Sequence, residues 1–173
     1  MKIGLFSPYD MFKGGGVQEH VVATQAELRR RGHDAIILTP QPRSYKGEIP
    51  EHMLFVGGSA DFKSPLHTVV QVSVTGSVEK IDEILSREQF DVLHIHEPWI
   101  PIVSRQLLSR SQSVNIGTFH ARLPDTRVSK TIERVIKPYT KSILKYIDFF
   151  TAVSDPASQS LRHLADVDVH MIP

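Results

Sequence analysis

Residues 2–32 read KIGLFSPYDMFKGGGVQEHVVATQAELRRRG. The apolar run at the start has no alternating polar side chains, which is typical of a strand buried on both faces of a parallel sheet. Three glycines follow, Gly14 to Gly16, and a segment of helical period begins at Val17. Gly32 suits the end of that helix, because glycine readily adopts the left-handed conformation found there. A strand, a glycine-rich turn and a helix in this order predict a parallel α/β fold.

The same alternation continues along the chain. We expect strands over Lys2 to Ser7, Ala35 to Thr39, Met53 to Val56, Val92 to His96, Val114 to Phe119, Phe149 to Val153 and Val169 to Ile172. We expect helices over Val17 to Arg31, Ser77 to Gln89, Ile100 to Arg110, Ser129 to Tyr146 and Asp155 to Leu164. Pro40 to Pro50 is predicted to be a loop, and His67 to Thr75 is either an extra strand or the start of the next helix. The pattern predicts one Rossmann-like domain over residues 1–173, with a doubly wound, mainly parallel sheet of about six or seven strands.

The composition excludes several classes of protein. The chain has no cysteine, so disulfides and thiolate metal sites are excluded, and its net charge of +1 gives no reason to expect nucleic acid. No window approaches the roughly 18 apolar residues of a membrane-spanning helix. The N-terminal residues carry no signal-peptide cleavage site and read as a buried strand. We therefore expect a cytoplasmic protein.

The glycine-rich turn GGGVQEH, residues 14–20, has the chemistry of an anion site. Glycines let backbone N–H groups approach a ligand closely, and the N-terminus of the following helix favours negative charge. A phosphate group fits such a place; the alternative is a tight turn that needs glycine only for its shape. The dinucleotide fingerprint GxGxxG is absent, and Thr39-Pro40 stands where a nicotinamide enzyme carries an acidic residue. A nucleotide-sugar epimerase or dehydrogenase is therefore disfavoured.

The motif DVLHIHEPW, residues 91–99, carries two histidines on a predicted strand. His94 and His96 alternate and therefore point to one face of the sheet. With Glu97 they resemble a metal pair, but no third ligand has suitable spacing nearby, so we predict no metal site. The alternative for His94 is a core histidine whose hydrogen bonds are satisfied.

The motif GTFHARLPD, residues 117–125, places His120 after the next predicted strand. A single histidine is more often structural than catalytic. Glu97, Trp99 and His120 nevertheless follow the carboxyl ends of strands, the edge at which open α/β sheets bind ligands. We therefore expect Gly14 to Gly16, Glu97 and His120 to lie around one crevice.

The predicted helix from Ser129 to Tyr146 carries its basic residues on one side. At about 100° per residue they fall within a stripe of about 80°. Pro138 is expected to kink or split this helix. The stripe is either an ordinary solvated face or a cationic surface for anionic lipid, which would hold the protein at the inner face of a membrane. Its members are Lys130, Arg134, Lys137, Lys141 and Lys145.

In their order and spacing, these motifs resemble those of one family. It is the retaining glycosyltransferases of the two-domain GT-B architecture, which include sucrose synthases and lipid mannosyltransferases. The matching segments are GGGVQEH, ELRRRGHDAIILTP, FDVLHIHEP, GTFHA, FTAVSD and VHMIP, and they run the full length of the chain. The resemblance implies that residues 1–173 are the N-terminal, acceptor-side domain and that a C-terminal donor-binding domain follows outside this chain.

The resemblance also implies a chemistry. Members of the family move a sugar from a nucleotide diphosphate-sugar to a hydroxyl group and keep the anomeric configuration. By position, Gly15 and Gly16 would face the donor phosphates, and His120 would lie near the transferred sugar. No metal or other cofactor would be required, and the isolated domain would be inactive. By position, the residues on the acceptor side would be Tyr9, Gln18, Ser59, Glu97 and Trp99.

Several residues depart from the lipid-mannosylating members of the family. Ala121 stands where those enzymes carry threonine after the histidine, and Trp99 stands in place of an asparagine. Val56-Gly57 stand in place of Tyr-Asn. The acceptor therefore stays open, with a membrane lipid as one class. The alternative function is a non-catalytic domain that binds a sugar or a nucleotide.

Overall fold

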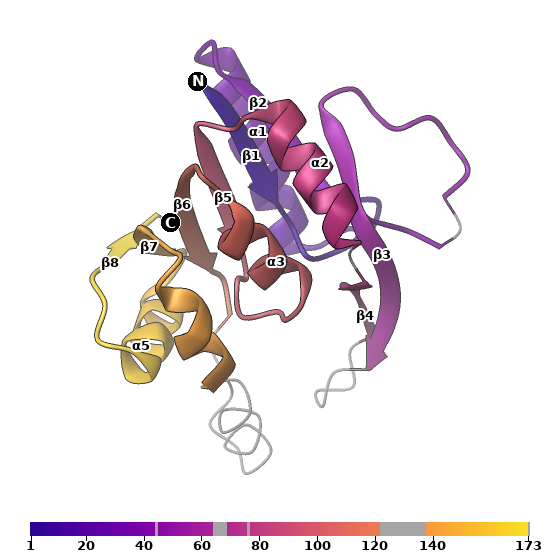
Figure 1. Ribbon diagram of the computed structural model, residues 1–173. Helices are drawn as coiled ribbons and strands as arrows, with labels where there is room; N and C mark the ends of the chain where they lie inside the picture. The colour runs from indigo at the N-terminus through magenta and orange to yellow at the C-terminus, as the bar shows by residue number, and fades with distance from the viewer. Residues whose placement is uncertain (44, 64–68, 76, 122–137, 173) are drawn as a thin grey trace.

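The computed structural model describes residues 1–43, 45–63, 69–75, 77–121 and 138–172. These residues form one eight-stranded sheet in the order β4-β3-β2-β1-β5-β6-β7-β8 (Figure 1). Every neighbouring pair of strands is parallel except β3 and β4, which are antiparallel. The strands are β1 Lys2–Phe6, β2 Asp34–Gln41, β3 Met53–Lys63, β4 Val69–Thr75, β5 Val92–His96, β6 Val114–Phe119, β7 Phe149–Ala152 and β8 Val169–Met171.

Helices cover both faces of this sheet, as a doubly wound fold requires. They are α1 Gly16–Arg30, α2 Val78–Glu88, α3 Val103–Arg110 and α5 Asp155–Leu164, and residues 138–144 are also helical. In Figure 1, α1 lies behind the sheet, whereas α2 and α3 lie in front of it. Among the described helices, none is long and apolar enough to cross a bilayer.

The pleat of the strands divides the core between the two faces. The smaller cluster of buried apolar side chains packs α1 on β1 and β2. The larger cluster packs α2 and α3 on the opposite face and continues to α5. Along β5, Leu93 and Ile95 belong to the larger cluster. Because successive side chains of a strand point to opposite faces, His94 and His96 lie on the side of α1.

The predicted fold is confirmed, and four elements differ by more than one residue from the expected bounds. β3 runs to Lys63, whereas the expected strand ends at Val56. β2 continues through Pro40 to Gln41, and its pairing with β3 is irregular at this point because proline has no N–H to donate. Of the two alternatives for His67 to Thr75, the strand is correct over Val69–Thr75, which makes eight strands. The helix expected from Ile100 begins at Val103 instead, after a turn in which Ile102 has a φ of 76°.

The helix expected from Ser129 to Tyr146 is only partly described, over residues 138–144. Pro138 is the first described residue of this helix, and the residues before it, which a kink would involve, lie outside the described part of the chain. Three members of the basic stripe lie there as well: Lys130, Arg134 and Lys137.

The strand order reverses beside β1. From β1 the chain moves outward through β2 and β3, and it later returns to place β5 on the other side of β1. Open α/β sheets bind ligands outside the carboxyl ends of the strands at such a reversal. The loops that follow β1, β5 and β6 all leave the sheet at this edge.

Candidate functional site

The three motifs that carry glycine, glutamate and histidine meet at the carboxyl edge of the sheet. Gly14 to Gly16 lie between β1 and α1, Glu97 follows β5 directly, and His120 follows β6. The N–H of Glu97 donates to the carbonyl of Thr118 at 2.8 Å, so the ends of β5 and β6 are paired up to this point. Parallel pairing of neighbouring strands thus brings together residues that are far apart in the sequence.

Glu97 links the ends of β5 and β6 through its side chain, which is 1% exposed. Its Oε1 accepts the backbone N–H groups of His120 at 2.7 Å and Ala121 at 3.0 Å. Its Oε2 accepts the indole N–H of Trp99. The φ of Glu97 is 51°, in the left-handed region that residues other than glycine rarely adopt. This strained backbone directs the carboxylate toward the His120 segment.

Four histidines gather on the α1 side of the same edge. Nδ1 of His96 lies 2.9 Å from Nε2 of His120, within hydrogen-bonding distance. The ring of His20, from α1, has its centroid 5.0 Å from that of His120 and 5.5 Å from that of His96. The rings of His94 and His96 stack with their centroids 4.3 Å apart. The α1 segment that opens with the glycines therefore packs directly against His96 and His120.

His94 belongs to a buried polar network in the sheet and does not face solvent. Its Nε2 hydrogen-bonds to Oγ1 of Thr118, which in turn hydrogen-bonds to Oγ1 of Thr151 on β7. All three residues are buried. Of the alternatives for His94, the structure favours the core histidine with a satisfied hydrogen bond.

Burial sets the protonation of this site. It lowers the pKa of His94 to about 3 and that of His120 to about 4, and it lowers the pKa of His96 well below its usual value. The neighbouring histidines add to these shifts, because a second positive charge nearby is unfavourable. Burial raises the pKa of Glu97 to about 7, although its three N–H donors act in the opposite direction. At neutral pH the histidines are therefore uncharged.

These shifts predict how stability depends on pH. Below about pH 6.5, the unfolded chain takes up a proton on each imidazole, whereas His94, His96 and His120 stay neutral in the folded state. Each such histidine lowers the free energy of unfolding by about 1.4 kcal/mol per pH unit as the pH falls toward its folded pKa. Glu97 opposes them with one proton, because its pKa is raised by folding. Three histidines act against the single glutamate, so the free energy of unfolding should fall as the pH is lowered.

Urea unfolding at about pH 7.5 and about pH 5.5 measures this effect. His94→Gln should reduce the difference between the two values. His170→Gln changes a histidine whose side chain is 63% exposed and should leave the difference unchanged. Equal stability at the two pH values would contradict the assignment of neutral buried imidazoles.

The other residues predicted on the acceptor side come from separate parts of the fold. Burial, and then the nearby carboxylate of Glu97, raises the pKa of Tyr9, so Tyr9 lies close to Glu97. Gln18 lies in the first turn of α1, and its Nε2 donates to the carbonyl of Asp10 at 3.3 Å, so the side chain folds back over the loop between β1 and α1. Ser59 lies on β3, where its backbone pairs with β4, and β2 lies between β3 and β1. The side chain of Ser59 is outside the described part of the structure.

Sequence reasoning missed three residues of this region. His20 ends the quoted motif GGGVQEH, and its position one turn after Gly16 was the available signal, because a helix repeats every 3.6 residues. Thr118 and Thr151 gave no signal, since β-branched residues are common in strands of any function. The grouping of His20 with His96 and His120 could not be found from spacing along the chain, because the three residues come from separate elements.

Comparisons with known proteins identify the family and agree with the fold. Residues 14–173 match Glycosyltransferase Family 4. A phosphatidyl-myo-inositol mannosyltransferase of Mycolicibacterium smegmatis is 30% identical, over 100% of this chain and 43% of that protein. One of Propionibacterium freudenreichii is 28% identical, over 97% of this chain and 44% of that protein. The solved structure of sucrose-phosphate synthase from Thermosynechococcus elongatus has a TM-score of 0.70 at 16% identity, over 99% of this chain and 47% of that one. The chain thus spans less than half the length of these relatives.

Proposed function

Because the chain belongs to glycosyltransferase family 4, we propose that it is the N-terminal, acceptor-side half of a retaining GT-B glycosyltransferase. The complete enzyme transfers a sugar from a nucleotide diphosphate-sugar to an acceptor hydroxyl. The nucleotide-sugar is a substrate, and no further cofactor takes part. A C-terminal donor-binding domain completes the site, in keeping with relatives that are about twice as long as this chain.

The observation that carries this proposal is the contact between α1 and His120. The ring of His20 lies 5.0 Å from that of His120, so the glycine-rich loop and His120 flank the same edge of the sheet. Gly15 is the N-cap of α1, and no described side chain caps this helix. The backbone N–H groups at Gly15 and Gly16 can therefore bind the diphosphate of the donor, and the helix dipole favours its negative charge.

His120 is the proposed catalytic residue. Its backbone N–H is bonded to Glu97 and its ring to His96, so both its main chain and its side chain are held in place. It is neutral at physiological pH, because its pKa is about 4. A neutral imidazole can hydrogen-bond a hydroxyl of the transferred sugar or the acceptor where charge develops in the transition state.

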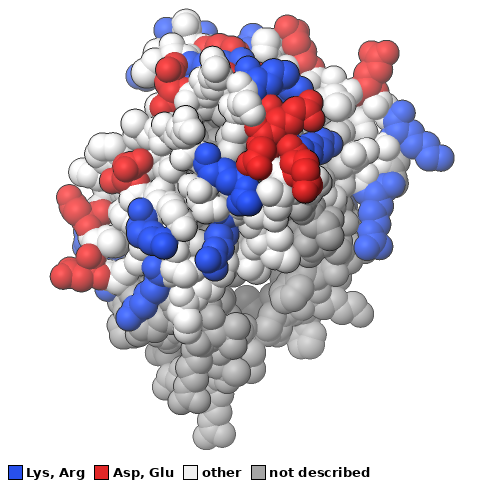
Figure 2. Space-filling view, in the orientation of Figure 1, with Lys and Arg blue, Asp and Glu red and all other residues white. Residues whose placement is uncertain are grey.

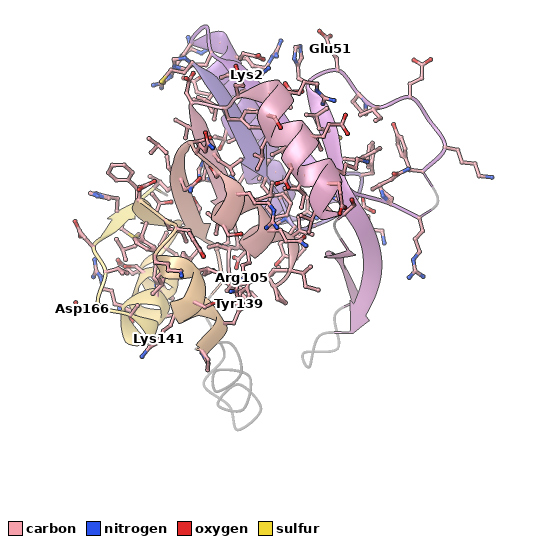
Figure 3. All side chains as sticks on the ribbon, viewed as in Figure 1. Lys2, Glu51, Arg105, Tyr139, Lys141 and Asp166 are labelled. Atoms are coloured by element: carbon pink, nitrogen blue, oxygen red, sulfur yellow. The ribbon has the colours of Figure 1, made fainter. Side chains whose placement is uncertain are left out.

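The acceptor is proposed to be a membrane lipid, bound by Tyr9, Gln18, Ser59 and Trp99, whereas the buried carboxylate of Glu97 holds the loop in place. The curated relatives are named for phosphatidyl-myo-inositol, which is a lipid. Lys141 and Lys145 are exposed. Figure 2 shows Lys and Arg side chains at the lower left of the view, in the part of the molecule where Figure 3 labels Arg105 and Lys141. With Lys130, Arg134 and Lys137, these lysines would hold the enzyme on the cytoplasmic face of a membrane.

A transfer assay tests the proposal with the complete protein and with residues 1–173 alone. Uridine and guanosine diphosphate-sugars are offered with anionic phospholipid vesicles or with a soluble polyol, and release of the nucleoside diphosphate is measured. Only the complete protein should transfer sugar, and proton NMR should show that the anomeric configuration is kept. Lys141→Glu with Lys145→Glu should weaken binding to the vesicles, whereas Lys46→Glu with Lys80→Glu, an equal change of charge, should not.

Several outcomes would contradict parts of this proposal. Tight donor binding by residues 1–173 alone, without transfer by the complete protein, would favour a non-catalytic binding domain. A product with inverted anomeric configuration would contradict the retaining mechanism. Transfer to the soluble polyol but not to the vesicles would replace the lipid by a soluble acceptor.

A further inference from the structure

Three of the histidines come from three different elements and converge on one point. His20 lies on α1, His96 ends β5 and His120 follows β6. One ring nitrogen of each residue lies within 4.8 Å of the corresponding nitrogen of the other two. The hydrogen bond between Nδ1 of His96 and Nε2 of His120 shows that these two rings already face each other through their nitrogens.

The spacing of the rings matches that of imidazoles around a metal ion. In a tetrahedral site with metal–nitrogen bonds of about 2.0–2.1 Å, ligand nitrogens lie about 3.4 Å apart and ring centroids about 5 Å apart. The three centroid distances here are 5.0, 5.2 and 5.5 Å. The ring centroids are therefore spaced as in a metal site, and the nitrogens, which lie within 4.8 Å of one another, would close to about 3.4 Å on binding an ion.

Two of the three rings are held firmly. Glu97 accepts the backbone N–H of His120, and His94 stacks on His96. These contacts restrict the positions that the two residues can adopt. Nε2 of His96 is buried and has no hydrogen-bond partner among the described residues, so His96 can carry its proton on either nitrogen without losing a bond. His20 is partly exposed, so the cluster is not sealed from solvent on this side.

We propose that His20, His96 and His120 bind one divalent transition-metal ion such as Zn²⁺, with water as the fourth ligand. Three imidazoles and no carboxylate among the ligands suit Zn²⁺, Ni²⁺ or Cu²⁺, and do not suit Mg²⁺ or Ca²⁺, which take oxygen ligands. The ion binds the ring of His120, the proposed catalytic group, and places a positive charge beside it where the transferred sugar is expected. Metal binding therefore inhibits sugar transfer. The inhibition rests on the proposed function, whereas the binding of the ion does not.

Titration of the untagged, metal-free protein with ZnCl₂ in a calorimeter tests the site directly, and titration with CoCl₂ gives the visible absorption typical of four-coordinate cobalt. We expect one ion per chain. His20→Gln should weaken binding at least about tenfold. His170→Gln removes an exposed histidine from β8 and should not change it. Circular dichroism establishes that both variants are folded.

Absence of saturable Zn²⁺ binding, or equal binding by the wild type, His20→Gln and His96→Gln, would overturn the site. Inhibition is measured separately in the complete enzyme. Zn²⁺ should lower its rate, a chelator should restore it, and MgCl₂ at the same concentration should have no such effect. Zn²⁺ binding at these histidines without loss of activity would leave the metal site intact and contradict the role given to His120, so the two proposals fail independently.

Discussion

Replacing His120 with alanine in the complete enzyme should lower kcat by about a hundredfold or more, which corresponds to about 2.7 kcal/mol of barrier. The lost ring is the hydrogen-bonding group proposed to meet the transition state. The substitution also leaves Nδ1 of His96 without its partner, so the free energy of unfolding should fall by about 1–3 kcal/mol. Steady-state kinetics and urea unfolding measure the two effects on the same preparation.

The control is His170→Ala, which removes an exposed imidazole from β8 and should change neither quantity. His120→Asn tests whether any hydrogen-bonding side chain at this position is sufficient. If His120→Ala kept the wild-type rate, His120 would be a structural histidine, and the catalytic group would have to come from elsewhere.

Replacing Glu97 with alanine should lower the free energy of unfolding by about 3–5 kcal/mol. The carboxylate is the shared acceptor for the N–H groups of His120 and Ala121 and for the indole of Trp99. Alanine leaves all three donors without that acceptor in a buried region. Alanine also keeps the strained φ of 51°, so the variant gains no relief of the backbone.

Urea unfolding followed by circular dichroism measures the loss, and fluorescence reports on the site separately. Trp99 is the only tryptophan of the chain, so a change in native emission reports a change in the surroundings of its indole, which is bonded to Glu97 in the wild type. Glu51→Ala is the matched control: its side chain is 88% exposed, and the change should stay within about 0.5 kcal/mol. A loss no larger in Glu97→Ala than in Glu51→Ala would mean that Glu97 does not organise the loop.

The pattern of apolar residues predicted most of the fold because the sheet is parallel and covered on both faces. Strands of this kind are continuous apolar runs, and β6 coincides with the predicted Val114 to Phe119. β4 was harder, since Val69–Thr75 alternates apolar and polar residues and pairs antiparallel to β3 at the end of the sheet. Local sequence cannot show which neighbour such a segment will find.

The site was predictable only in part for a similar reason. Motifs placed Glu97 and His120 at ends of strands, which is a local property. That the carboxylate of Glu97 binds the N–H of His120, 23 positions later, depends on the pairing of β5 with β6. The position of His20 beside both depends on how α1 packs across the sheet. The spacing of these residues along the chain does not reveal the contacts between them.

The alternation along β5 has a consequence for folding fidelity. His94 and His96 point to one face and Leu93 and Ile95 to the other. A slip of β5 by one residue against its neighbours would exchange the two sets, putting imidazoles into the apolar core and leucine and isoleucine against the buried hydroxyl of Thr118. The polar residues of this strand therefore help to fix its register and disfavour misaligned sheets. Libraries that vary His94 and His96 to change activity would weaken this control of register, and should be screened for aggregation as well as for turnover.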